Sequence, residues 1–412
     1  MQDNEKKPAL RFKGFTDPWE QRKLGDAFER VVRKNTNNES RLPLTISAQD
    51  GLVDQITYFN NRVASRDVSN YYLAYNGEFA YNKSTSDGYP FGAVKRLDWY
   101  EKGVLSTLYI VFALKHPEKD DSDFMTVFYD TDRWHRGVAE RAAEGARNHG
   151  LLNISADDFF DIDAAMPEDK AEQEQIGRLL KKLDTLITLH QRKYDKLVNI
   201  KKSMLDKMFP KNGASVPEIR FKGFTDPWEQ RKVGELLTER NEQAPMSNEY
   251  PLMAFIANEG VAPKGERYDR SALVNDTASK LYKKTKFGDF IYSSNNLETG
   301  SIGLNKYGKA SISPVYSIFE PTGIADSDFL GRRLIRKDFI NEMVKWRQGV
   351  IYGQWRIHES DFIKIEVAVP TVEEQCKIGL LLDNLDTLIT LHQRKLEKLQ
   401  NIKKSCLEKM FV

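Results

Sequence analysis

Two segments of this 412-residue chain occur twice, whereas the stretches between them do not. Residues 11–23 read RFKGFTDPWEQRK, and residues 220–232 repeat these thirteen residues without a change. Residues 183–193 read LDTLITLHQRK and return as residues 385–395, at the start of a 27-residue stretch with 22 identical positions. Two fixed segments around two divergent inserts predict a pseudo-two-fold molecule with two separate recognition surfaces.

The composition is that of a globular protein with more than one domain. The length favours two or more domains, and 40% hydrophobic and 11% aromatic residues suffice for their cores. The net charge is only +2, so a nucleic-acid site would have to come from local patches. Two cysteines, Cys376 and Cys406, are too few for a disulfide framework and favour a reducing compartment. The first ten residues lack the apolar stretch of a secretory signal, and no run reaches the roughly 20 apolar residues of a membrane span, so we expect a cytoplasmic protein.

Each half of the chain contains an insert, over residues 26–167 and 235–370. Short β-branched and aromatic runs in the first insert, VSNYYLAY, VLSTLYIVFAL and FMTVFYD, predict strands of a mixed or antiparallel sheet. The Ala-, Arg- and Glu-rich stretch 132–148 predicts a helix. The inserts share an outline despite little identity, so we expect one fold with two surfaces. Three pairs of segments align: 75–82 with 286–293, 103–112 with 309–319, and 150–167 with 353–370.

A long helix is predicted after each insert. Apolar residues alternate at spacings of three and four over four to five heptads, which is the pattern of a coiled-coil seam. His190 and His392 interrupt the pattern, and a polar seam residue usually fixes register or partner. Pro210 ends the first helix. The predicted seam positions are Leu180, Leu183, Ile187, His190, Tyr194 and Leu197 in the first copy, and Leu382, Leu385, Ile389, His392, Leu396 and Leu399 in the second.

The lengths of the predicted helices suggest a spacing function. A helix of about 34 residues measures roughly 50 Å. Two such helices, paired antiparallel within one chain, would hold the insert domains at opposite ends of a rod. Two-fold proteins read DNA half-sites one or more turns of about 34 Å apart. Divergent inserts would then read two different half-sites, and the helices would fix the gap between them.

The repeated segments resemble the specificity subunit of type I restriction–modification systems over essentially the whole chain. The resemblance rests on RFKGFTDPWEQRKLG, on the EQ…IG segments and on the helix ending KLVNIKKSMLDKMF. The EQ…IG residues are Glu172, Gln173, Ile176 and Gly177 in the first copy, and Glu374, Gln375, Ile378 and Gly379 in the second. The duplicated order of segment, insert and helix makes the resemblance specific.

This resemblance implies a non-catalytic subunit whose two target-recognition domains each read one half of a split DNA sequence. The implied fold class is α+β, with two pseudo-two-fold-related α/β recognition domains joined by two long conserved helices in an antiparallel coiled coil. The implied partners are double-stranded DNA, two modification (methyltransferase) subunits that bind S-adenosylmethionine, and restriction subunits that use ATP and Mg²⁺. The expected boundaries are residues 1–167 for the first frame and domain, 168–210 for the first helix, 211–370 for the linker, second frame and second domain, and 371–412 for the second helix.

The motifs of the partner enzymes are absent from the sequence. Adenine methyltransferases of this kind carry an [ND]-P-P-[YF] motif, which this chain lacks. Residues 303–311, GLNKYGKAS, approach a P-loop but place Ala310 where Ser or Thr must hold Mg²⁺. The six histidines and two cysteines show no ligand spacing, so no zinc or other metal site is expected.

Candidate DNA-binding residues come from basic and amide side chains in the inserts. Phosphate contacts use Lys, Arg and small polar groups, whereas base contacts use Arg, Asn, Gln, Ser or Thr on elements that enter a groove. The loops after residues 75–82 and 286–293 occupy matching positions, which is the best argument for them. The candidates are Lys83, Ser84, Thr85, Lys95, Arg96, Arg133, His135 and Arg136 in the first insert, and Ser293, Ser294, Asn295, Asn296, Lys306, Lys309, Arg347 and Gln348 in the second.

Two other functions remain open from the sequence. A stand-alone sequence-specific DNA-binding regulator would use the same two readers and would bind DNA tightly by itself. A purely structural coiled-coil scaffold leaves the divergence of the two inserts unexplained. Repeats this similar could also be encoded by similar DNA, which would permit recombination that exchanges one insert.

Overall fold

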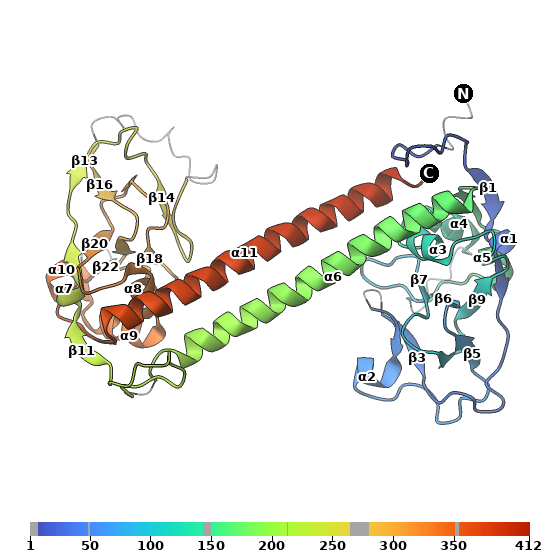
Figure 1. Cartoon of the computed structure of the whole chain (residues 1–412), viewed down its shortest axis with the longest axis horizontal. Helices are drawn as coiled ribbons and strands as arrows, with labels where there is room; N and C mark the ends of the chain where they lie inside the picture. The colour runs from blue at the N-terminus through green and yellow to red at the C-terminus, as the bar shows by residue number, and fades with distance from the viewer. Residues whose placement is uncertain (1–6, 48–49, 143–149, 212, 264–279, 351–353) are drawn as a thin grey trace. The chain divides into compact units, whose positions relative to one another are not determined.

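The computed structural model divides the chain into two compact units (Figure 1). Unit 1 holds residues 1–192 and 394–412, and unit 2 holds residues 193–393. Because both division points fall within the two long helices, each unit contains one part of each helix. The structure describes residues 7–47, 50–142, 150–211, 213–263, 280–350 and 354–412.

Unit 1 is built from short antiparallel strands and short helices that precede the long helix α6. Its strands are β1 (Glu20–Lys23), β2 (Phe28–Arg30), β3 (Leu44–Ser47), β4 (Gly51–Asp54), β5 (Tyr72–Tyr75), β6 (Phe79–Asn82), β7 (Ala93–Arg96), β8 (Lys102–Leu105), β9 (Ile110–Leu114) and β10 (Asp163–Met166). Its helices are α1 (Leu24–Ala27), α2 (Gln55–Phe59), α3 (Ser122–Phe128), α4 (His135–Arg141), α5 (Ala156–Phe160) and the first part of α6 (Lys170–Lys207).

Unit 2 follows the same plan. Its strands are β11 (Glu229–Lys232), β12 (Leu237–Glu239), β13 (Gln243–Ala244), β14 (Ala254–Ile256), β15 (Gly260–Ala262), β16 (Tyr282–Thr285), β17 (Phe290–Tyr292), β18 (Ile302–Leu304), β19 (Ala310–Ile312), β20 (Ser317–Pro321), β21 (Gln348–Val350), β22 (Gln354–Arg356) and β23 (Glu366–Val369). Its helices are α7 (Val233–Leu236), α8 (Ser327–Arg333), α9 (Lys337–Lys345), α10 (Glu359–Phe362) and the first part of α11 (Val372–Lys409).

The central sheets of the two units have the same order, as the aligned sequence segments predict. Unit 1 has the order β2-β9-β6-β7, and unit 2 has the order β12-β20-β17-β18. Phe79 of β6 pairs with Phe112 of β9, and Phe290 of β17 pairs with Phe319 of β20. All four phenylalanines are at most 1% exposed and belong to the core of their unit. The prediction that the two inserts share one fold is therefore confirmed.

The strand prediction for FMTVFYD is wrong, because these residues form most of helix α3. Asp121 caps the helix by accepting a hydrogen bond from the Phe124 N–H at 2.7 Å. Phe124, Val127 and Phe128 then share one face at helical spacing and are buried in the core. The helix predicted over residues 132–148 forms as α4, and residues 143–149 lie outside the described residues.

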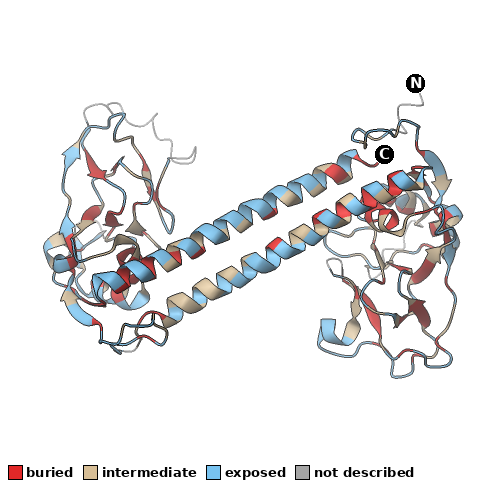
Figure 2. Ribbon diagram, in the orientation of Figure 1, coloured by how far each residue is buried: buried red, intermediate tan, exposed pale blue. Residues whose placement is uncertain are grey.

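The long helices α6 and α11 pack against each other within each unit. In unit 1, Leu180 near the start of α6 shares a core with Met410, just past the end of α11. In unit 2, Leu382 near the start of α11 shares a core with Met208, just past the end of α6. Figure 2 shows these helix ends among the buried residues of each unit. Start packs against end in both units, as antiparallel pairing requires, and the predicted fold class is confirmed.

The predicted seam residues are all buried or half-buried. His190 is among the buried ones, with 7% of its surface exposed. The buried members are Leu180, Leu183, His190, Leu382, Leu385 and Leu396, and the half-buried members are Ile187, Tyr194, Leu197, Ile389, His392 and Leu399.

The repeated segments close each core with the same aromatic cluster. Trp19 is 1% exposed and meets Phe124 edge-on at 6.0 Å between ring centroids, and Phe411 at 5.9 Å. In unit 2, Trp228 meets Phe329 at 5.5 Å and Phe209 at 6.0 Å. Such edge-on pairs stabilise by about 0.5–1.5 kcal/mol beyond the burial of their area. The turn-rich repeated segment is thus a packed cap on each core.

Candidate nucleic-acid interface

Buried polar contacts fix the start of each long helix to the cap that precedes the insert. The guanidinium of Arg11 binds both carboxylate oxygens of Glu172, at 2.6 and 2.7 Å, and Glu172 is only 1% exposed. Arg220 binds Glu374 in the same bidentate way, at 2.7 and 2.8 Å. A paired carboxylate tolerates burial that an isolated one does not. The EQ…IG residues that support the family resemblance are therefore structural.

The glutamine of the same motif connects the helix to the insert. Gln173 Oε1 accepts a hydrogen bond from the Asp121 N–H at 2.8 Å, and Nε2 donates to the Pro167 carbonyl at 2.9 Å. Gln375 makes the equivalent bonds to Asp326 N and Pro370 O, at 3.0 and 2.9 Å. Each recognition surface is thus held at a fixed position relative to its helix.

The first predicted loop of unit 1, residues 83–85, lies against residues 150–154. Thr85 donates from its backbone N–H to the Gly150 carbonyl at 2.7 Å and from Oγ1 to the same oxygen at 3.1 Å. The Lys83 ammonium reaches the Ile154 carbonyl at 3.3 Å. Ser84 stays exposed beside them. The two segments, far apart in sequence, therefore form one polar edge of unit 1.

The basic cluster before and within α4 extends this edge. The ring of His135 lies 5.0 Å from that of Phe91, which belongs to the loop between β6 and β7. Burial lowers the pKa of His135 although Asp132 opposes the shift, so the imidazole is neutral at pH 7. Arg136 is 88% exposed and pairs with Glu140 one turn along. Arg133 donates to the Glu408 carbonyl of α11 at 3.3 Å, so its guanidinium faces the helix pair.

The corresponding loop of unit 2 lies against the hairpin β21–β22. Asn295 Oδ1 accepts a hydrogen bond from the Trp355 N–H at 2.6 Å, and Ser294 Oγ accepts one from the Ile357 N–H at 3.0 Å. Arg347 donates to the Ser294 carbonyl at 3.1 Å and pairs with Glu298 at 3.0 Å. The hairpin residues occupy the positions that residues 150–154 hold in unit 1.

The other candidates of this loop region are not equally accessible. Asn296 is exposed, whereas Ser293 is buried and donates from its backbone N–H to the Ser301 carbonyl at 2.8 Å. Gln348 is exposed and donates to Asp361 at 3.3 Å. Asn295, Asn296 and Gln348 thus provide exposed amide groups of the kind that read base edges.

Four predicted basic residues lie in ion pairs away from these loops. Lys95 pairs with Asp130 at 2.8 Å, and Arg96 with Asp98 at 2.6 Å and Asp123 at 2.8 Å. Lys306 pairs with Asp328 at 3.1 Å and with Asp383, and Lys309 pairs with Glu249 at 2.5 Å. Arg96 is 10% exposed at its side chain, so it has little surface for a phosphate. The polar edges defined above are the better candidates for DNA contact.

Sequence reasoning missed the exposed residues of hairpin β21–β22. Trp355 is 49% exposed, and the neighbouring Arg356 side chain is 56% exposed. A large aromatic and a cation side by side at a surface suit stacking and phosphate contact. Gln354, Trp355 and Arg356 are adjacent in the sequence, but Trp355 stands 60 positions from Asn295, so only the folded unit brings it to the predicted loop.

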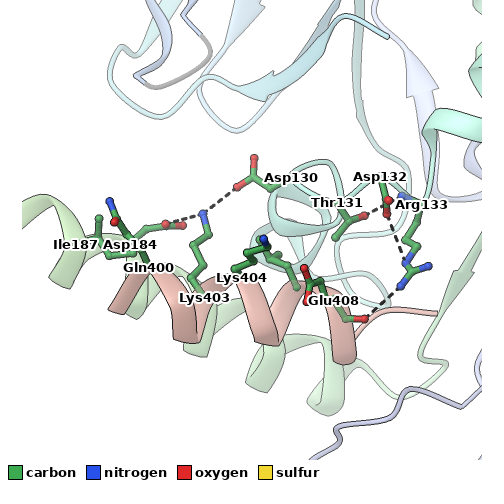
Figure 3. Close-up of a pocket in the computed structure, with 11 residues that line it drawn as sticks. Asp130, Thr131, Asp132, Arg133, Asp184, Ile187, Gln400, Lys403, Lys404 and Glu408 are labelled. Atoms are coloured by element: carbon green, nitrogen blue, oxygen red, sulfur yellow. Dashed lines mark hydrogen bonds and ion pairs between the residues drawn. The ribbon is translucent and has the colours of Figure 1, made fainter. Parts of the chain in front are cut away.

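A cavity of about 500 Å³ lies in unit 1 between the insert and the helix pair, and Figure 3 shows the residues that line it. Lys403 of α11 stands between Asp184 of α6, at 2.6 Å, and Asp130 of the insert, at 3.4 Å. Burial opposes the charge of Lys403, but the two carboxylates raise its pKa. Lys403 thus connects the helix pair to the insert at this cavity.

The described residues contain no signature of two other kinds of site. Within them, no helix combines the length and apolarity needed to cross a membrane. No group of three or more His, Cys, Asp or Glu side chains among them could hold a metal ion. Residues 303–311 connect β18 to β19, so the sequence that approaches a P-loop does not lead into a helix.

Comparison with known proteins gives a family for the second half of the chain. Residues 225–401 match the family "Type I restriction modification DNA specificity domain". No curated protein matches the chain. The matched residues run from the second repeated segment, through the whole second insert, into helix α11.

Solved structures of specificity subunits are similar to the entire chain. The S subunit of a type I restriction–modification system from M. genitalium has 14% identity and a TM-score of 0.51, and the alignment covers 98% of this chain and 99% of that one. The HsdS subunit from Thermoanaerobacter tengcongensis has 16% identity and a TM-score of 0.41, over 95% and 96% of the two chains.

The fold and the family match define a protein with two DNA-recognition units on a helical frame. The match to a type I restriction modification DNA specificity domain covers residues 225–401. The first half repeats the same capping segment, sheet order and helix, and the S-subunit fold extends over nearly the whole chain. The family match in the second half, together with this fold, supports a DNA sequence-specificity subunit of the type I restriction–modification class.

Proposed function

We propose that each unit reads one half of a bipartite DNA target through its polar edge. In unit 1 this edge comprises residues 83–85, the start of α4 and residues 150–154. In unit 2 it comprises residues 294–296 and the hairpin β21–β22. The observation that carries the proposal is that the two edges occupy equivalent positions on one fold but present different side chains, cations in one and amides with a tryptophan in the other.

The side chains of the two edges suit different kinds of DNA contact. Arg136 and Lys83 suit phosphate contacts, which position a protein without specifying sequence. Asn295, Asn296 and Gln348 carry amides that form paired hydrogen bonds with adenine in the major groove. Trp355 offers a flat apolar surface beside these amides. Different half-sites for the two units follow from this difference.

The helices α6 and α11 set the spacing between the half-sites and dock the modification subunits in this proposal. Each helix is continuous over 38 residues, or about 57 Å at the rise of an α-helix. Exposed leucines occur in the identical helix repeat, with Leu189 46% and Leu391 58% exposed. The same apolar residue on both helices supports docking of two copies of one partner.

The chemistry of modification and cleavage belongs to the partners. S-adenosylmethionine would be bound by the modification subunits, and ATP with Mg²⁺ by restriction subunits. The side chains of the polar edges contribute binding and orientation of DNA only. The stand-alone regulator is the second candidate, and it is favoured only by the presence of both readers in one chain.

A methylation map tests the proposal. The chain would be expressed with a modification subunit of a related system in a host lacking its own, and the genome would be sequenced for N6-methyladenine. We expect a split motif with a fixed gap, methylated once on each strand. Replacement of Trp355 and Asn295 by alanine should relax one half of that motif and leave the other half unchanged.

The opposite outcomes are distinct. If the complex forms but variants in both units alter the same half of the motif, the assignment of one half-site to each unit is wrong. If no complex forms and the chain alone binds a specific DNA sequence with nanomolar affinity, the regulator is the correct function.

A further inference from the structure

The contact between each insert and the first turns of its own helix uses opposite charges in the two units. Helix position 181 of α6 corresponds to position 383 of α11, because the identical helix repeats begin two residues later. The residue is Lys181 in the first helix and Asp383 in the second. The helix sequence from residue 183 or 385 onward is largely shared, whereas the turns before it differ at several positions, of which 181 and 383 carry opposite charges.

Each of these helix residues pairs with its own insert. Lys181 donates to Asp123 of α3 at 2.9 Å, and Arg96 of β7 binds the same carboxylate at 2.8 Å. Asp383 pairs with Lys306, beyond β18, and lies 3.6 Å from Arg332 of α8. Burial raises the pKa of Asp123, but Lys181 and Arg96 outweigh it and lower the pKa overall.

Two insert positions that face the helix gain a cation in unit 2. β6 pairs with β7 as β17 pairs with β18, so that Arg96 corresponds to Leu304 and Asp98 to Lys306. The capped starts of α3 and α8 place Arg332 where the first insert has Val127. The second insert therefore places two additional cations, Lys306 and Arg332, beside Asp383, whereas Asp123, the partner of Lys181, is retained as Asp328.

One ion pair between the helices occurs in both units, but the insert contacts its lysine in unit 1 and its aspartate in unit 2. Asp184 pairs with Lys403 in unit 1, and the equivalent Asp386 pairs with Lys201 in unit 2. The first insert adds a carboxylate to the lysine, whereas the second adds Arg332 to Asp386 at 2.9 Å. The helix–helix ion pair is therefore the same in both units, although the insert contacts it with a carboxylate in one unit and a guanidinium in the other. The helix residue at position 181 or 383, in contrast, changes its charge with the insert.

We infer that each insert is charge-matched to the first turns of its own helix, so that a transferable recognition module ends inside the helix, between residues 181 and 183 or between 383 and 385. If only the insert were exchanged, up to residue 167 or 370, the charge-matched helix residue, Lys181 or Asp383, would not be transferred with it. The identical repeat begins where the matched surface ends. That these modules recognise DNA rests on the proposed function; the charge matching itself does not.

A charge-reversal cycle in unit 2 tests the matching in the full-length chain. Asp383→Lys places a third cation beside Lys306 and Arg332, and amide hydrogen exchange in α8 should accelerate about fivefold or more. Lys306→Asp, added to Asp383→Lys, restores an opposite-charge pair at these two positions and should restore at least half of the lost protection on a logarithmic scale. Additive effects of the two substitutions would overturn the inference.

A matched pair of variants repeats the test in unit 1. Lys181→Asp should accelerate exchange in α3, because it places two carboxylates against each other. Lys182→Asp makes the same change of charge at the adjacent, exposed position and should leave α3 unchanged. Equal effects of the two variants would show that charge on the helix matters but contact with the insert does not, and would refute the inference.

Two grafts test the module boundary. The long graft replaces residues 24–182 by residues 233–384, and the short graft replaces residues 24–167 by residues 233–370, which retains Lys181. The short graft should unfold about 2–4 °C below the long one, and Lys181→Asp should restore it. Equal unfolding temperatures would contradict the boundary. These measurements use the chain without DNA or partner subunits, so failure of the proposed function leaves them interpretable.

Discussion

Units 1 and 2 have the same frame and different recognition edges. Arg11–Glu172 and Arg220–Glu374 are the same bidentate pair, and both carboxylates are buried. Outside the frame, the edge of unit 1 presents Arg136 whereas that of unit 2 presents Trp355. The two units therefore have identical residues where the cap positions the insert, and different residues at the exposed edges proposed to bind DNA.

The strongest test of frame equivalence is the removal of the helix-end phenylalanines. Phe411→Ala and Phe209→Ala each delete a buried ring from an aromatic cluster with a tryptophan and another phenylalanine. Each should destabilise its own unit by about 3–5 kcal/mol, the usual cost of such a cavity. Hydrogen exchange resolved by unit measures both effects. A large effect in only one unit would break the equivalence.

The buried glutamines provide a second, smaller comparison. Gln173→Leu and Gln375→Leu keep the side-chain volume but leave a backbone N–H and a carbonyl of the insert without their partner. We expect a loss of about 1–3 kcal/mol in the affected unit. Urea unfolding of both variants measures this loss of stability. If one variant loses stability within the expected range and the other does not, the two glutamine contacts are not equivalent.

The ion pairs Lys181–Asp123 and Asp383–Lys306 should lose their contribution to stability in acid in the same way, although the carboxylate lies on the insert in one pair and on the helix in the other. Interactions with Lys306 lower the pKa of Asp383, and the pKa of Asp123 is also lowered. A carboxyl with a lowered pKa contributes stability above its ordinary value of 3.8, and loses it as pH falls through the folded value. Lys181→Met and Lys306→Met should cost at most about 1 kcal/mol at pH 7.

The pH dependence of these two variants supplies the control. The difference in stability from the unchanged chain should shrink as the pH falls below 3.8. A difference that stays constant down to pH 2 would mean that lost packing of the lysine stem, and not its charge, causes the effect.

The smallest effect on stability is expected at the exposed edge of unit 1. Arg136→Ala removes an 88% exposed guanidinium and should change stability by less than about 0.5 kcal/mol. In the assembled complex it should nevertheless weaken DNA binding and lower the salt dependence by about one phosphate contact. Arg178→Ala, which removes another exposed arginine paired with a glutamate one turn away, is the matched control and should leave binding unchanged.

Much of the fold was predictable because repeats act as an alignment within one chain. The repeated segments predicted the equivalent units, and the heptads predicted the long helices. FMTVFYD was misread because a short apolar run has no decisive period, although Asp121 before it is a common helix cap. The cap was visible in the sequence and would have corrected the prediction.

The recognition edges were only partly predictable. The loops after β6 and β17 are predictable as candidate DNA-binding loops from the sequence alone, because they follow aligned segments of the two inserts. Asp98 stands two residues from Arg96, but the other acidic partners, Asp130 of Lys95 and Asp123 of Arg96, are far away in sequence, so no local pattern reveals them. Trp355 was missed because its hairpin meets the loop only in the folded unit.

The most direct test of two equivalent modules is the methylation map of the long graft, with residues 233–384 in place of residues 24–182. This chain has the same recognition edge in both units. The account predicts that the graft, assembled with modification subunits, methylates an inverted repeat of the half-site assigned to unit 2. A map with the original two different half-sites would contradict the account, because recognition would then not reside in the exchanged residues.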